Sequence, residues 1–214
     1  MFLGAMQECL TDLYGLDLPY DVNDFLVTDQ VLADSLGGSE RRVEEKLLIA
    51  DHGDEARISL YLQRGLVERL SDNDPTTELN ADNLADFWTA FEGVSHFTYF
   101  VFKASNDQSV TLLELELQAE VDKFVGTGLF LQRQGEVVPS GLHRWLFDLP
   151  RFDGKLSEAE QQRYECANHY AARYCRRIQR ELLNGPMGDA MRRKLRHFYR
   201  LPRQEKIGLI DAPV

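Results

Sequence analysis

Carboxylate side chains recur at every second position in the stretch "LLELELQAEVDK" (112–123), where Glu114 and Glu116 alternate with leucines and Glu120 follows. On a β-strand, residues two apart project from the same face, about 7 Å from each other. Two carboxylates at that separation could hold a divalent cation through oxygen ligands. A strand with one face in water has the same pattern. We therefore interpret the stretch first as a solvated strand, with a metal-dependent hydrolase as the alternative.

A second group that could do chemistry is the pair Glu92 and His96 in "EGVSH". The pair flanks a predicted helix-to-strand turn, a suitable place for a general base and its orienting partner. In the strand pairing that we expect, His96 falls opposite Leu117 on the leucine face, which favours a packed, hydrogen-bonded core histidine. No metal or cofactor is assigned. The candidate catalytic residues are Glu92, His96, Glu114, Glu116 and Glu120.

The C-terminal helices carry a stripe of basic side chains. At 100° per residue, four of them lie opposite the apolar docking face of the first helix, and four more line the next helix. Arginine suits planar, bidentate recognition of phosphate or carboxylate, so nucleic-acid or phosphate binding is one interpretation. The preferred one is neutralisation of an acidic surface on the same chain or on a second protomer. The predicted binding surface comprises His169, Arg173, Arg176, Arg180, Arg192, Arg193, Arg196 and Arg200.

The charge is distributed unevenly along the 214 residues. Residues 151–214 carry 14 Lys and Arg against 8 Asp and Glu, a net charge of +6. Because the whole chain has a net charge of −11, residues 1–150 carry −17. We expect an acidic α+β domain over 1–140 and a basic helical extension over 141–214, packed on the same core. No apolar run approaches the roughly 20 residues of a membrane span. Three scattered cysteines favour reduced thiols and a cytoplasmic location.

Hydrophobic periodicity and turn residues predict the elements that position these groups. Apolar alternation predicts two β-hairpins, over 43–63 around "HGDE" and over 96–118 around "SNDQ", and an edge hairpin over 129–138. A capping box, Ser157 with Glu160, begins a long helix. Softer patterns predict a short strand over 24–29 and a short helix over 29–38. The remaining helices are expected over 3–14, 84–94, 119–126, 157–183 and 186–201.

Together these patterns predict an α+β protein: a mostly antiparallel sheet built from two hairpins with packed helices, followed by a C-terminal helical pair. The order of elements over about residues 1–125 is similar in outline to the small dimeric chaperones of type III secretion, although no motif carries this likeness and no family is assigned. We expect a non-catalytic binding or regulatory protein that acts through protein–protein contacts as a homodimer. Nucleic-acid binding is an alternative, and no membrane contact is expected.

Overall fold

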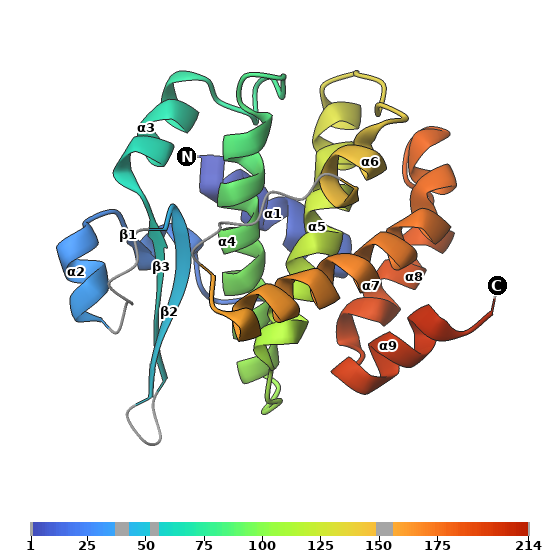
Figure 1. The fold of residues 1–214 in the computed structure, drawn as a ribbon. Coiled ribbons are helices and arrows are strands. Elements are labelled where there is room, and N and C mark those ends of the chain that lie inside the picture. The colour runs from blue at the N-terminus through green and yellow to red at the C-terminus, as the bar shows by residue number, and fades with distance from the viewer. Residues whose placement is uncertain (1, 37–42, 52–55, 149–155, 214) are drawn as a thin grey trace.

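A computed structural model describes residues 2–36, 43–51, 56–148 and 156–213 of the protein (Figure 1). The described part of the chain is predominantly helical and contains a small sheet. The strands β1, β2 and β3 span Leu26–Val27, Glu45–Asp51 and Ala56–Leu62, and a 3₁₀ helix, η1, spans Val22–Phe25. The helices are α1 (Phe2–Tyr14), α2 (Gln30–Ser35), α3 (Arg64–Asp72), α4 (Leu84–Ala104), α5 (Leu112–Arg133), α6 (Leu142–Phe147), α7 (Glu158–Leu183), α8 (Asp189–Arg200) and α9 (Arg203–Asp211).

The helix α5 lies at the centre of the molecule. It packs between α4 on one side and α7 on the other, and α1 crosses behind both α4 and α5 (Figure 1). The sheet packs against the opposite side of α4, with α2 on its outer face, while α8 contacts α1 and α9 contacts α7. One continuous hydrophobic core runs from Phe2 to Ile210, so the acidic and basic parts of the sequence share it.

The sheet is mixed and has the strand order β1–β3–β2. The predicted hairpin over 43–63 is confirmed, because β2 and β3 pair antiparallel with Glu45 opposite Leu62; its turn, 52–55, lies outside the described residues. The short strand expected over 24–29 is also present, but β1 pairs with β3 in parallel, with Leu26 opposite Leu60. The prediction of an antiparallel sheet built from two hairpins is therefore wrong.

The second hairpin is replaced by a pair of long helices. Residues 96–104 end α4, residues 112–118 begin α5, and residues 105–111 connect them. The expected edge hairpin over 129–138 is wrong because α5 continues to Arg133. The leucine–glutamate alternation misled because α5 is enclosed on several sides. Leu117 and Glu116 lie on different faces of α5 and are both buried. The sequence of α5 therefore lacks the single apolar stripe of a helix that buries only one face. The sequence did carry a helix signal, since Thr111 and Glu114 form a capping box.

The C-terminal prediction is closer to the structure. The capping box of Ser157 and Glu160 begins α7, which ends at Leu183 as expected. The predicted docking face is buried against α5. The second helix, α8, begins at Asp189, and α6 and α9 were not predicted. None of the described helices combines the length and apolarity needed to cross a lipid bilayer.

Candidate metal centre

Two helices and one strand bring a histidine and four carboxylates together at the edge of the core. Glu92 and His96 are four residues apart on α4, and Glu116 and Glu120 are four apart on α5, so each pair shares one helix face. The strand β2, which packs against α4, adds Glu45, its first residue. We call these five residues, with Lys123 and Arg163, the rim cluster.

The imidazole of His96 occupies the middle of the rim cluster. Its Nδ1 lies 3.4 Å from Oε1 of Glu45, and its Nε2 lies 3.5 Å from Oε2 of Glu116. Both separations exceed the usual 2.7–3.2 Å of a hydrogen bond. Nε2 is buried and has no hydrogen-bond partner among the described residues, and only 7% of His96 is exposed. Burial of a polar nitrogen without a close partner is costly, so the imidazole is incompletely satisfied where it lies between Glu45 and Glu116.

The spacing of the candidate ligand atoms suits a metal ion. One atom each of Glu45, Glu92 and His96 lies within 4.8 Å of the other two. Metal–ligand bonds of about 2.1 Å place adjacent ligands of an octahedron ~3.0 Å apart and opposite ones ~4.2 Å apart. A small movement of side chains would therefore complete the geometry. Glu116, on the other side of the imidazole, could orient the ring as carboxylates commonly do for metal-bound histidines.

Two cations also take part in the rim cluster. Lys123 Nζ donates to Glu92 Oε2 at 2.7 Å and to Glu120 Oε1 at 2.8 Å. Arg163 on α7 lies farther from its partner, with Nε 3.6 Å from Glu116 Oε1, and this Nε has no hydrogen bond within the described chain. Four carboxylates thus face two permanent cations and an imidazole whose pKa is raised. If a divalent cation displaced the imidazole proton, the four carboxylates would balance that ion, Lys123 and Arg163.

The pKa shifts show that the rim cluster attracts positive charge. Burial lowers the pKa of His96, but the carboxylates of Glu116 and Glu45 outweigh burial and raise it well above its usual value. Burial likewise lowers the pKa of Lys123, yet its partners Glu120 and Glu92 raise it above its usual range. The carboxylates therefore create a negative potential that favours positive charge at these positions, and a metal ion bound by His96 would have to displace the imidazole proton.

The carboxylates respond differently to their surroundings. Burial raises the pKa of Glu45 and the pKa of Glu120. For Glu92, burial would raise the pKa, but the ammonium of Lys123 and the imidazole of His96 lower it overall. Among Glu45, Glu92 and Glu120, Glu92 is therefore the carboxylate held most firmly in its ionised form.

A glycine makes room for Glu45 beside α4. A Cβ atom on Gly93 would lie 2.8 Å from Cγ of Glu45 and 2.8 Å from Cδ1 of Leu60. Real Cβ atoms do not approach other atoms so closely. The absence of a side chain at Gly93 is thus what allows β2 to place the carboxylate of Glu45 against α4.

Four of the five candidate catalytic residues meet in the rim cluster. The fifth, Glu114, does not, because its carboxylate accepts from N and Oγ1 of Thr111 and caps the start of α5. The sequence contained a signal for the cluster in the four-residue spacing of both pairs, which fits one face of a helix. The members that sequence reasoning missed are Glu45, Lys123 and Arg163.

The predicted arginine surface is only partly a surface. Arg196 donates to the carbonyls of Leu13 and Asp12 at 2.9 and 3.0 Å, and Arg200 donates to those of Tyr14 and Gly15 at 3.0 and 3.3 Å, so both bind the C-terminal end of α1. Such contacts place cations where the helix dipole is negative. Arg173, which pairs with Asp211 of α9, and Arg192 are half-buried. The exposed members besides Arg200 are His169, Arg176, Arg180 and Arg193.

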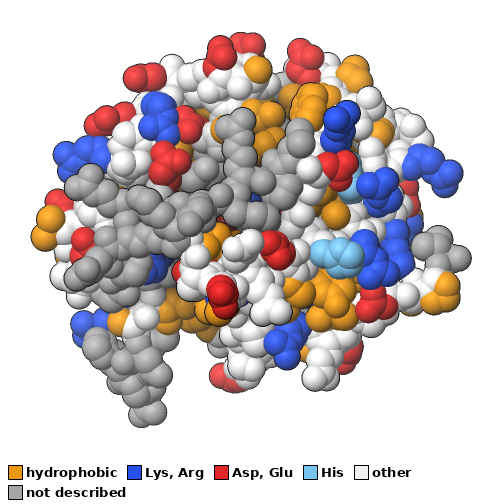
Figure 2. All heavy atoms as spheres, viewed as in Figure 1, with side chains coloured by type: hydrophobic (Ala, Val, Ile, Leu, Met, Phe, Trp, Pro, Cys, Tyr) orange, Lys and Arg blue, Asp and Glu red, His pale blue; other side chains and the backbone are white. Residues whose placement is uncertain are grey.

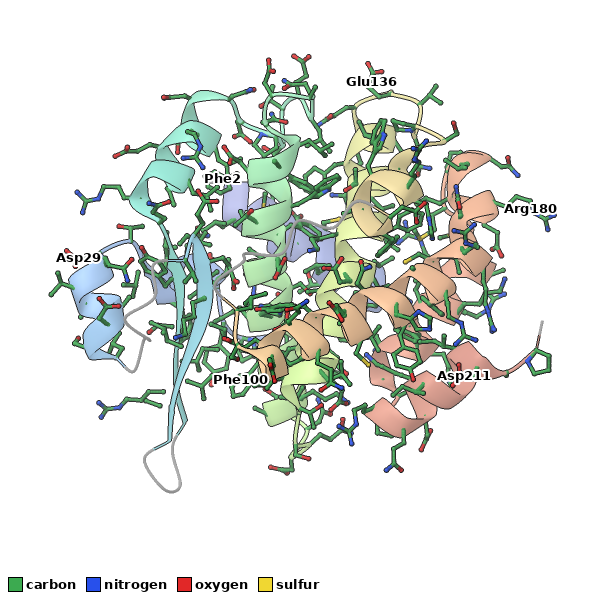
Figure 3. The ribbon with its side chains drawn as sticks, in the orientation of Figure 1. Phe2, Asp29, Phe100, Glu136, Arg180 and Asp211 are labelled. Carbon is green, nitrogen blue, oxygen red and sulfur yellow. The ribbon has the colours of Figure 1, made fainter. Side chains whose placement is uncertain are left out.

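Basic side chains still gather on the side of the molecule that α7 to α9 form, as Figure 2 shows. Arg180 extends outward from α7 (Figure 3). Arg177, which was not predicted, instead turns toward α9 and donates to the carbonyls of Leu209, Ile210 and Ala212 at 2.6–3.0 Å. Arginines therefore hold the ends of two helices, and the face left for an external anion is smaller than expected.

The opposite side of α5 holds a second polar group, which we call the inner network: Tyr14, Ser95, Gln118, Asp122 and Lys206. Asp122 accepts from Tyr14, from Ser95 Oγ at 2.6 Å and from Gln118 Nε2 at 2.8 Å. Lys206 of α9 donates to Gln118 Oε1 at 2.6 Å. Asp122, Gln118 and Lys206 are fully buried. The network therefore joins four helices within the core.

Burial governs the ionisation of the inner network. It raises the pKa of Asp122 to about 6, against the lowering effect of hydrogen bonds from Ser95 and Tyr14. Burial, reinforced by the nearby ammonium of Lys103, lowers the pKa of Lys206 to about 7. The rings of Tyr99 and Phe198 lie 4.5 and 4.8 Å from Lys206 Nζ and stabilise its charged form.

Comparison with protein-family models, with curated proteins and with solved structures finds no match to this chain. Function must therefore be argued from the chemistry of the sites. The rim cluster combines convergent ligands, partial exposure and excess negative charge, whereas the inner network is sealed. The rim cluster is the stronger functional candidate.

Proposed function

We propose that the protein binds a divalent cation at Glu45, Glu92 and His96, and that it uses this cation for hydrolysis. The observation that carries the proposal is the convergence of a buried imidazole with carboxylates from a strand and a helix, all within 4.8 Å. Oxygen ligands with a single nitrogen suit cations such as Mn²⁺ and Fe²⁺. The proposal keeps the metal-dependent class of the sequence-based alternative but moves the ligands from the row of Glu114, Glu116 and Glu120, which lies on a helix and not on a strand, to the group at Glu45, Glu92 and His96.

Hydrolysis follows from what such a cation does to water. A bound divalent cation lowers the pKa of a coordinated water and so generates a nucleophile near neutral pH. A general base is then needed nearby. Glu120 is suitable because it shares the ammonium of Lys123 with the ligand Glu92, and its side chain is 19% exposed, so it can exchange protons with solvent.

The binding step is tested with Glu45→Gln, which removes a ligand charge while keeping the shape of the side chain. We expect Mn²⁺ affinity, measured by isothermal titration calorimetry, to fall by at least about tenfold. Glu44→Gln is the matched control, because Glu44 is the neighbouring residue, is half exposed and pairs with Arg69 instead. Absence of Mn²⁺ binding by the wild-type protein, or equal affinity in both variants, would contradict the proposal.

The catalytic step is tested with a chromogenic phosphodiester and a chromogenic ester as probes. We expect Mn²⁺-dependent hydrolysis of at least one probe, abolished by a chelator and reduced about 100-fold or more by Glu120→Gln because the general base is lost. The variant should retain its Mn²⁺ affinity within a few fold. Hydrolysis that is indifferent to chelator would refute a metal-dependent reaction.

The expected protein-binding function, as a homodimer, is a second candidate. It is favoured by apolar side chains at α2, where Val31 is 79% exposed, Leu32 48% and Leu36 37%. Exposed apolar groups that lie together often mark contact surfaces. Sedimentation velocity should show a dimer for the wild-type protein and a monomer for Val31→Asp. A wild-type monomer at high concentration would exclude this self-association.

A further inference from the structure

Lys123 lies between two carboxylates of the rim cluster, one of which belongs to the candidate metal site. Its Nζ bridges Glu92 and Glu120 at 2.7 and 2.8 Å, and the residue is only 8% exposed. Glu92 also belongs to the candidate ligand group with Glu45 and His96. One carboxylate is therefore shared between the proposed ion and the ammonium, as a bridging carboxylate is shared between two metals.

We propose that Lys123 supplies the second positive charge of a two-cation centre, so that the chain holds one divalent ion beside a covalently attached ammonium. This inference rests on the proposed function, because the first position is the metal site itself. The charge count supports it: four carboxylates balance one divalent ion, Lys123 and Arg163. Replacing the ammonium by a second divalent ion would satisfy the same carboxylates.

The arrangement also defines the class of substrate. In two-metal hydrolases the ions, about 3.5–4 Å apart, stabilise the attacking and the leaving oxygen. An ammonium has three N–H donors, and two of those on Lys123 are directed at carboxylates. The third can donate to an oxygen that develops negative charge. The centre therefore suits an ester or phosphoester, with water on the metal and the departing or carbonyl oxygen near Lys123.

The experiment compares the number of Mn²⁺ ions bound per chain in the wild-type protein and in Lys123→Met. Native mass spectrometry counts the ions, and electron paramagnetic resonance reports whether two ions are close enough to couple. We expect one ion in the wild-type protein and a coupled pair in Lys123→Met. Lys123→Arg, which keeps the charge, should bind one ion.

Lys194→Met is the matched control, because Lys194 also pairs with a glutamate, Glu181, but is 56% exposed. It should bind one ion. Lys123→Gln is measured in parallel, and both variants are also refolded with Mn²⁺ present, because removing the ammonium leaves carboxylates unpaired and could prevent folding without a cation. Circular dichroism confirms that each sample is folded before ions are counted.

The four possible outcomes separate this inference from the proposed function. One ion in the wild-type protein and two coupled ions in the variants support both. One ion in the wild-type protein and one or none in the variants overturns the role of Lys123 alone. No ion in the wild-type protein and one in the variants overturns the proposed function but supports Lys123 as a substitute cation. No ion in any sample overturns both.

Discussion

The two sides of α5 carry polar groups that differ in charge balance and exposure. The inner network contains one carboxylate, Asp122, and one ammonium, Lys206, linked through Gln118, and both are fully buried. The rim cluster places four carboxylates around two permanent cations, and its side chains are 9–23% exposed. The difference indicates that one helix serves two purposes. Its inner face fixes the positions of other helices, and its outer face is prepared for an added cation.

The largest expected effect comes from breaking the inner network. Asp122→Ala leaves the hydroxyls of Tyr14 and Ser95 and the amide of Gln118 without their acceptor, so we expect the free energy of unfolding to fall by roughly 3–5 kcal/mol. Urea denaturation measures this. Asp72→Ala, on an exposed residue, should change stability by less than about 0.5 kcal/mol. If Asp122→Ala lost as little unfolding free energy as Asp72→Ala, the inner network would contribute little to stability.

The same comparison predicts different behaviour for Mn²⁺ binding. Because Asp122 faces away from the metal site, the folded fraction of Asp122→Ala should keep its Mn²⁺ affinity within about twofold. Glu45→Gln should do the reverse, losing affinity with little change in stability. If both variants lost affinity equally, the two sides of α5 would have to be treated as a single coupled unit.

The next largest expected effect is a pH dependence of stability that arises from the inner network. The pKa of Lys206 falls from 10.5 to about 7 on folding, so between these values the unfolded chain binds a proton that the folded chain does not. Stability contributed by this residue therefore rises with pH from about 7 to 10, by up to about 1.4 kcal/mol per pH unit. Asp122 acts in the opposite direction at lower pH, because its pKa rises from 3.8 to about 6 on folding and the folded chain then binds a proton that the unfolded chain does not. Between these two pKa values its contribution to stability falls as the pH rises.

Lys206→Met isolates the contribution of the lysine. Subtracting the unfolding free energy of Lys206→Met from that of the wild-type protein should give a difference that increases between pH 7 and 10. Lys194→Met is the control for removing an exposed lysine. Parallel curves for the wild-type protein and Lys206→Met would mean that Lys206 keeps an ordinary pKa.

A smaller effect is expected from Gly93→Ala, which sharpens the definition of the metal site. The added methyl group would meet Glu45 and Leu60, so the Glu45 side chain must move away from His96. We expect Mn²⁺ affinity to fall about three- to tenfold, a cost of about 0.7–1.4 kcal/mol. Calorimetry measures this change.

Gly65→Ala is the control for the glycine substitution. Gly65 also lies in a helix, α3, but the nearest atom to its added Cβ would be a flexible arginine nitrogen at 3.6 Å. Its Mn²⁺ affinity should stay at the wild-type value while the helix gains up to about 1 kcal/mol. Unchanged affinity in Gly93→Ala would indicate that Glu45 is not a ligand.

Local signals in the sequence predicted the ends of the fold better than its centre. The capping box at Ser157 and the alternation of residues 56–62 each depend on neighbours in the chain, and both predictions are confirmed. The α4–α5 pair was missed because its pattern depends on tertiary surroundings. Aromatic and β-branched residues of α4 resemble a strand, and Glu116 and Asp122 are tolerated inside because distant residues pair with them.

The candidate site was predicted only in part, again because some of its members depend on tertiary surroundings. Glu92, His96, Glu116 and Glu120 were selected from residue type, although the strand geometry assumed for the last two was wrong. Glu45 could not be selected, since its approach depends on the absence of a side chain 48 positions later in the chain, at Gly93. Charge asymmetry indicated the basic helices, but not that their arginines would bind main-chain carbonyls.

These arginine contacts have a consequence for how related sequences would vary. Arg177, Arg196 and Arg200 bind carbonyl oxygens at positions 12–15 and at positions 209, 210 and 212. A carbonyl is present whatever the side chain, so these contacts constrain the three donors but put no constraint of their own on the side chains of the acceptor residues. Homologues should therefore keep the arginines even where an acceptor residue differs. A search for co-varying pairs would miss these contacts entirely.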